Sequence, residues 1–89
     1  MKQKEATVFG DYIREMRKEK GWSQPELAKQ SGLSQSLISL IEKGYSPTSL
    51  TVKSIKGLAK AIDRDVRDLV DAAANEELLE QDDVLAFRK

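Results

Sequence analysis

The sequence predicts an all-α fold with five helices and an additional C-terminal segment, which is helical or extended. Three observations support this class. Apolar residues recur three and four positions apart along much of the chain. Residues that cap helices precede these stretches, and glycine follows several of them. The 89 residues make one domain with a single small core.

The first helix is predicted from about 9 to 20, because four apolar residues share one face: Phe9, Tyr12, Ile13 and Met16. Gly21 ends this helix. Trp22 then lies between two helices, where its large side chain would seal the edge of the core. Its indole N–H could alternatively donate to a phosphate.

The second helix is predicted to begin at Gln24. Ser23, followed three residues later by Glu26, forms a capping box that satisfies first-turn N–H groups. Pro25 is tolerated because these N–H groups have no partner within the helix. Gly32 ends the helix, since glycine adopts a left-handed conformation without steric cost.

The third helix is predicted from its cap, Ser34, to about Lys43, and Gly44 closes it. Two helices that cross steeply over so short a turn form a helix-turn-helix. In DNA-binding versions the second of these helices enters the major groove. The spacing is specific, because counting from Gln24 the fifth position is small, the ninth is glycine, and the fifteenth and eighteenth are apolar: Ala28, Gly32, Ile38 and Ile41.

The fourth helix is predicted near Thr51, after a loop at 45–49, with one apolar face: Val52, Ile55, Leu58, Ala59 and Ile62. Gly57 inside this helix predicts close packing against a neighbour. Asp65 caps a fifth helix that begins at Val66.

Three parts are expected along the chain. Residues 1–8 form an N-terminal arm, 9–73 the helix-turn-helix DNA-binding domain, and 74–89 an acidic C-terminal tail. The tail is too apolar for a purely disordered segment. It is therefore expected to dock, either on its own domain or on a partner.

Charge is segregated along the chain although the net charge is zero. Residues 1–62 hold eleven Lys and Arg against six Asp and Glu, a net +5, whereas 63–89 hold four against nine, a net −5. A basic body with an acidic tail suggests an interaction surface. Individually, the same charges also fit solvated helix faces.

Cysteine and histidine are both absent. No disulfide framework or thiolate metal site can form, and most nucleophile–base pairs are excluded. We therefore expect no enzyme, no metal, no cofactor and no small-molecule substrate. No apolar run approaches the ~20 residues that span a bilayer, and the N-terminus lacks the apolar region of a secretory signal. A cytoplasmic protein without membrane contact is expected.

The block SQPELAKQSGLSQSLISLIEKG resembles the helix-turn-helix of the Cro and lambda-repressor-like family, also called the Xre type. The resemblance extends from about Phe9 to Val70 and includes Arg17, Gly21 and the later segments LAKAI and DRDVRDLV. It implies five helices around one core that bind operator-like DNA, usually as a dimer. It also implies a bacterial, phage or mobile-element context.

The outward face of the third helix carries the predicted base contacts: Gln35, Ser36, Ser39 and Leu40. Gln35 lies near the start of the helix, and its amide can bond both N6 and N7 of adenine. By resemblance, the first residue of this helix is a base-reading glutamine. The two serines would discriminate weakly. Leu40 either contacts a thymine methyl or packs against the domain.

Predicted phosphate contacts flank this face: Gln24, Ser34, Lys43, Tyr45 and Ser46. Gln24 and Ser34 lie at helix starts, where N–H groups and the helix dipole favour a phosphate. The resemblance implies that Gln24 also braces the base-reading glutamine. Alternatively, Ser34 is only a cap and Gln24 is only solvated.

The resemblance further implies that Arg17 and Glu42 form a structural pair, which ties the third helix to the first. The planar fork of arginine suits a bidentate contact with a carboxylate. The alternative is two exposed charges that contribute little to stability.

A dimer is expected because one module buries only ~600–1,000 Å² on DNA. Two modules about one helical turn apart match a palindromic operator. The dimer surface is predicted from the apolar residues of the fifth helix and the tail: Val66, Leu69, Val70, Leu78, Leu79 and Leu85. We hypothesise that the tail mediates self-association or recruits a regulatory protein partner.

The sequence thus favours a sequence-specific transcriptional regulator, a repressor that binds double-stranded DNA as a homodimer. The alternative is a protein-interaction module, such as an antitoxin or antagonist whose acidic tail binds a partner protein. Both functions can coexist in one chain.

Overall fold

The computed structural model describes residues 2–3, 8–46 and 50–88. Within these residues the chain forms six helices and one ladder of two short strands: β1 (Lys2–Gln3), α1 (Val8–Glu19), α2 (Gln24–Ser31), α3 (Gln35–Glu42), β2 (Tyr45–Ser46), α4 (Val52–Ile62), α5 (Val66–Asn75) and α6 (Gln81–Arg88). The all-α class is confirmed, and helix boundaries agree with the expected ones to within a few residues.

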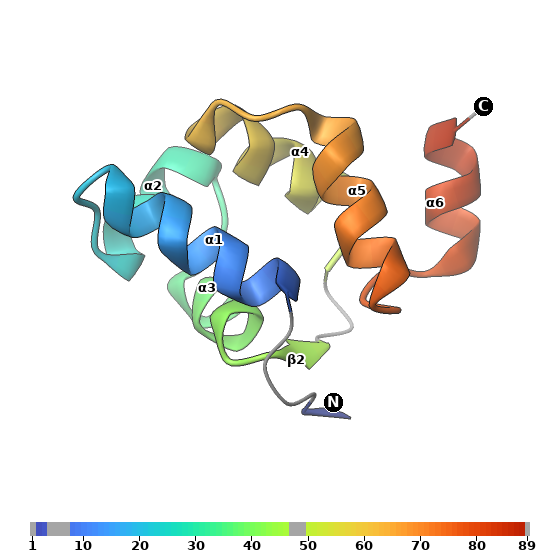
Figure 1. Ribbon diagram of the computed structural model, residues 1–89, viewed down its shortest axis with the longest axis horizontal. Coiled ribbons are helices and arrows are strands. Elements are labelled where there is room, and N and C mark those ends of the chain that lie inside the picture. Colours follow the sequence, from blue (N-terminus) through green and yellow to red (C-terminus); the bar gives the residue numbers. More distant parts are fainter. Residues whose placement is uncertain (1, 4–7, 47–49, 89) are drawn as a thin grey trace.

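The helices pack around one core (Figure 1). The first helix, α1, packs on α3 and α5, while α2 packs on α3 and α4. The last helix, α6, packs on α4 and α5. The largest fully buried side chains come from the first five helices: Phe9, Ile13, Leu27, Ile38, Ile55, Leu58, Ile62, Leu69 and Val70. The apolar faces that the sequence predicts therefore point inward.

Side-chain caps begin four of the helices where the sequence places them. The Oγ of Ser23 accepts from the N–H of Glu26 at 3.2 Å, and that of Ser34 accepts from Leu37 at 3.1 Å. Thr51 and Asp65 cap α4 and α5 in the same way. Each cap satisfies an N–H that has no partner within its helix.

Gly32 and Gly57 have the backbone conformation and the close packing that the sequence predicts for them. Gly32 ends α2 with φ of 75°, in the left-handed region that glycine adopts freely. Gly57 packs so closely that a Cβ added to it would overlap the backbone carbonyl of Ser31, the last residue of α2. The close packing predicted at Gly57 is confirmed, and it joins α4 to the end of α2.

The tail forms a helix that docks on its own chain. Leu78 and Val84 are buried in the core. The carboxylate of Asp83 accepts from the N–H of Val52 at 2.7 Å, which adds a cap to α4 from a distant part of the chain. Arg88 pairs with Asp71 on α5 at 2.6 Å. The sequence left open whether the tail is helical or extended, and whether it docks on its own domain or on a partner. The structure shows a helix that docks on its own domain.

This docking corrects part of the predicted dimer surface. Leu69, Val70 and Leu78 have at most 5% of their surface exposed and belong to the core. The packing of α1, α4 and α6 on α5 leaves little of these side chains available to a second chain. Within the predicted set, Val66 and Leu79 are half-buried and Leu85 is exposed.

Two long-range contacts at the N-terminal end were not predicted. β1 pairs antiparallel with β2, with Lys2 opposite Ser46 and Gln3 opposite Tyr45. Glu76, at the end of α5, accepts from the N–H groups of Val8 and Phe9 at 2.9 and 2.7 Å and so caps α1. Residues 47–49 of the expected loop, and 1 and 4–7 of the expected arm, lie outside the described residues.

Candidate nucleic-acid interface

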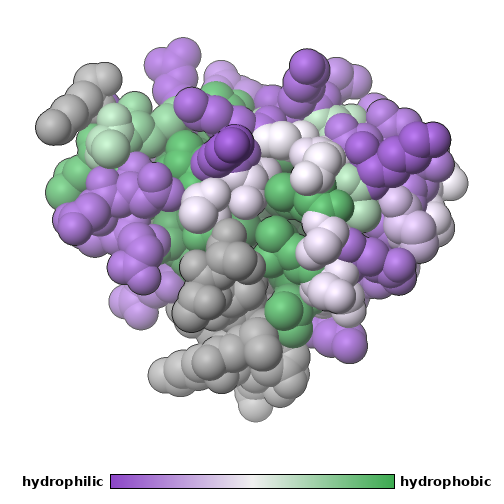
Figure 2. Space-filling view, turned by 180° about the vertical axis from the view of Figure 1, so that it is seen from behind, coloured by the Kyte–Doolittle hydropathy of each residue, from purple (hydrophilic) through white to green (hydrophobic). Residues whose placement is uncertain are grey.

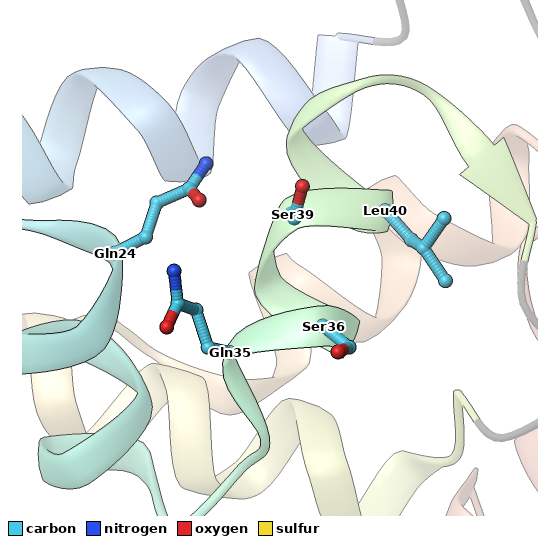
Figure 3. Close-up of a pocket in the computed structure, with 5 residues that line it drawn as sticks. All are labelled: Gln24, Gln35, Ser36, Ser39 and Leu40. Carbon is cyan, nitrogen blue, oxygen red and sulfur yellow. The ribbon is translucent and has the colours of Figure 1, made fainter.

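The outer face of α3 borders an open hollow at the surface (Figure 3). Its lining comprises one residue of α2 and four of α3: Gln24, Gln35, Ser36, Ser39 and Leu40. These include all four predicted base contacts. They face outward because Leu37, Ile38 and Ile41 bury the opposite side of α3. The hollow therefore combines two amides, two hydroxyls and one apolar side chain.

The lining residues differ in exposure. Gln35 and Ser36 are exposed at the start of α3, whereas Gln24, Ser39 and Leu40 are half-buried. An α-helix fits the width of the DNA major groove, and side chains near its start are placed to reach base edges. Leu40 lines the same hollow as the polar groups, so its side chain is available to an apolar group there.

Two of the predicted phosphate contacts, Ser34 and Lys43, lie at the two ends of α3. Ser34 is exposed and its hydroxyl is engaged as the cap of α3. Lys43 is exposed at the C-cap of α3. Tyr45 and Ser46 follow in β2, directly after α3 in the chain. The side chains of Tyr45 and Ser46 lie outside what the structure describes.

Arg17 and Glu42 meet in a bidentate pair that joins α1 to α3. The Nε and Nη2 atoms of Arg17 donate to the two carboxylate oxygens at 2.8 and 3.0 Å. The side chains are 13% and 1% exposed. The pKa of Arg17 is raised, mainly by its hydrogen bond to Glu42, against a smaller opposing effect of burial. The pair is buried, unlike two surface charges.

Glu42 has two further partners. Arg14 lies one turn before Arg17 on α1, donates to the backbone carbonyl of Glu42 at 2.8 Å, and has its Nε 3.5 Å from the carboxylate. Gln24 donates from its amide nitrogen to the carboxylate at 3.2 Å. The contact of Arg14 with Glu42 was not predicted from the sequence. The signal was its spacing of three residues from Arg17, which places both arginines on one face.

Trp22 also belongs to this cluster. Its backbone carbonyl accepts from Nη1 of Arg17 at 2.8 Å. Its half-buried ring packs against the core, and the ammonium of Lys20 lies 5.3 Å from the ring centroid. This position matches the expected seal at the edge of the core.

The acidic residues around α6 lie away from α3. Helix α6 is at one end of the molecule, whereas α2 and α3 are toward the other (Figure 1). The exposed acidic residues around α6 include Glu77, Glu80 and Asp82. None of the helices in the described ranges is both long and apolar enough to cross a membrane.

Residues 13–69 match the sequence profile of a protein family described as helix-turn-helix. The chain belongs to the helix-turn-helix family. The match covers all of α2, α3 and α4, together with most of α1 and the start of α5. The resemblance to the Cro and lambda-repressor-like, or Xre-type, family is confirmed.

Two curated relatives in this helix-turn-helix family come from Bacillus subtilis (strain 168). The transcriptional regulator SinR is 33% identical over 64 residues, which cover 72% of this chain and 57% of SinR. The transcriptional regulator SlrR is 37% identical over 65 residues, which cover 73% of this chain and 42% of SlrR. The chain thus spans about half the length of these relatives.

Solved helix-turn-helix structures are also similar. The restriction-modification controller protein C.AhdI from Aeromonas hydrophila is 41% identical with a TM-score of 0.61, over 71% of this chain and 92% of that one. SinR, solved in complex with DNA, is 33% identical with a TM-score of 0.62, over 72% of this chain and 100% of that one.

Proposed function

We propose that this chain is a sequence-specific DNA-binding transcriptional regulator, a repressor that inserts α3 into the major groove of a palindromic operator. The observation that carries the proposal is the hollow on α3. Its amides and hydroxyls line an open hollow, while the opposite side of α3 is packed into the core. A helix so presented can reach base edges with its polar side chains.

Similar proteins support this proposal. SinR and SlrR are named HTH-type transcriptional regulators, and the SinR structure contains DNA. C.AhdI is named a controller protein. The match to the family profile covers the part of this chain that holds α2 and α3.

In this proposal the residues have distinct roles. The four side chains of α3 that line the hollow, Gln35, Ser36, Ser39 and Leu40, read bases. The flanking residues Gln24, Ser34, Lys43, Tyr45 and Ser46 contact phosphates. Residues 9–73 form the DNA-binding unit. The acidic end of the molecule, at α6, is held away from DNA, which avoids repulsion of phosphates.

The proposed regulator acts as a homodimer, and its dimer surface shares only Leu69 with the predicted one. Among the described residues, two large apolar side chains are exposed. Val8 has 73% of its surface exposed and Leu85 has 49%. Val8 borders an apolar hollow between α1 and α5, together with Tyr12, Leu69 and Ala72. From behind, apolar side chains also reach the surface at the α6 end of the molecule (Figure 2). We assign the dimer contact to the hollow at Val8, since its lining is almost wholly apolar.

The alternative function, a partner-binding antitoxin or antagonist, depends on a tail that is free to bind. The structure engages this tail through Leu78, Val84 and Asp83 on its own domain. These contacts favour a stabilising role for α6 over a free binding segment.

Selection of duplexes from a random pool, at a stated salt concentration, tests the proposal. The wild-type chain is expected to enrich a palindromic motif whose half-sites are about one helical turn apart. Gln35→Ala is expected to lose preference at one or two base positions, because a bidentate amide contact contributes ~1–3 kcal/mol. Gln81→Ala, on α6, is the matched control and should select the wild-type motif. Enrichment of no motif by the wild-type chain would refute the proposal.

A further inference from the structure

The orientation of the Gln24 amide is determined by its contact with Glu42. A carboxylate can only accept hydrogen bonds, so the amide atom 3.2 Å from its Oε1 must be the nitrogen. The carbonyl oxygen of Gln24 is consequently left for the hollow that Gln24 lines with Gln35. An amide on a free surface would lack this constraint and could turn over.

Glu42 acts only as an acceptor in its contact with Gln24. Both of its carboxylate oxygens accept from Arg17, and Arg14 approaches the same carboxylate. The side chain is 1% exposed, so water does not compete for these bonds. Arg17 and Gln24 therefore both donate to Glu42, which is a buried acceptor.

Gln35 lines the same hollow as Gln24. Figure 3 shows its amide nitrogen turned toward the side chain of Gln24, whose oxygen lies on that side. An oxygen that can only accept favours an N–H opposite it. Gln35 then keeps its nitrogen on the side of Gln24 and its oxygen on the other side.

We propose that Glu42 is a positioning residue for base reading: through Gln24 it sets the amide orientation of Gln35 and makes Gln35 selective for adenine. This inference rests on the proposed function. In the major groove adenine presents an acceptor, N7, beside a donor, N6, and so matches an N–H beside a C=O. Guanine presents two acceptors, N7 and O6, and cannot match a fixed amide. An amide free to turn would distinguish these bases less well.

The test uses variants that release the Gln24 amide without leaving a buried charge unpaired. In Arg17→Met/Glu42→Met both partners of the ion pair are replaced by apolar side chains of similar length, a change that is often neutral for stability. Gln24→Met removes the amide and keeps the ion pair. Asp83→Ala removes a cap of α4 on the side of α6 and controls for general loss of stability.

The readout is the ratio of affinities for the selected operator and for the same operator with guanine in place of the adenine read by Gln35. Both Met variants are expected to lower this ratio about tenfold, the lower range of a bidentate contact, while affinity for random DNA changes less. The triple variant should show no further loss, because Glu42 acts through Gln24. Asp83→Ala should melt at a lower temperature and keep the wild-type ratio.

A wild-type ratio in either folded Met variant would overturn the inference, as would losses that multiply in the triple variant. If the double variant does not fold, the side-chain amide NMR signal of Gln24 in the wild-type chain decides. Its protons should exchange more slowly than those of the exposed Gln81, and equal rates would count against the bond to Glu42. A wild-type chain that selects no operator refutes the proposed function, whereas a selected operator with unaffected variants refutes only this inference.

Discussion

Arg17→Ala is expected to destabilise the chain far more than a surface charge change would. The substitution removes two hydrogen bonds at 2.8 and 3.0 Å from a carboxylate that is 1% exposed. Breaking a buried pair by removing one partner costs ~3–5 kcal/mol. The Nε of Arg14 remains 3.5 Å from the Glu42 carboxylate and Gln24 still donates to it, so the lower end, about 3 kcal/mol, is expected.

This loss converts into a large shift of the melting temperature. For a domain of this size each kcal/mol corresponds to ~4–8 °C, so the midpoint should fall by roughly 12–24 °C. The total free energy of unfolding of such a chain is only ~4–13 kcal/mol, so urea unfolding should show the change clearly. Circular dichroism at 222 nm, at about neutral pH, follows the loss of helix in both thermal and urea unfolding.

Arg88→Ala is the matched control. Its pair with Asp71 is shorter, at 2.6 Å, but the side chains are 50% and 56% exposed. An exposed pair contributes ~0–1 kcal/mol, so the control should melt within several degrees of the wild-type chain. Equal losses in the two variants would refute the argument that burial, and not distance, decides the contribution of Arg17.

Three further outcomes are expected. Lys43→Ala should lower the slope of log affinity against log salt by about 0.9, the change for one phosphate contact, and Lys60→Ala on α4 should leave it unchanged. Gly57→Ala should lower stability by ~1–3 kcal/mol in urea unfolding although alanine is the better helix former, since its Cβ meets the Ser31 carbonyl; a gain in stability would contradict that packing. Val8→Ser should raise the dimer dissociation constant in sedimentation, and Leu85→Ser should not; the reverse result would move the dimer contact to α6.

The sequence alone was sufficient wherever the cause of a structure is local. Ser23, Ser34, Thr51 and Asp65 cap helices because each side chain reaches an N–H two or three residues away. Periodic apolar residues likewise showed which side of α3 is buried and which faces outward, so the residues of the hollow could be predicted. The place of Gln35 and Ser36 follows from this periodicity.

Only the tertiary structure decided which elements meet. An apolar stripe shows that a helix face is buried but not what buries it, so Leu69, Val70 and Leu78 fitted a dimer surface equally well. The caps from Glu76 and Asp83 join residues 31 or more positions apart, a relation that no local pattern encodes. The contacts of Arg14 and Gln24 with Glu42 could not be predicted from a local pattern either. These residues lie on three separate helices, which must pack together before both donors can reach one carboxylate.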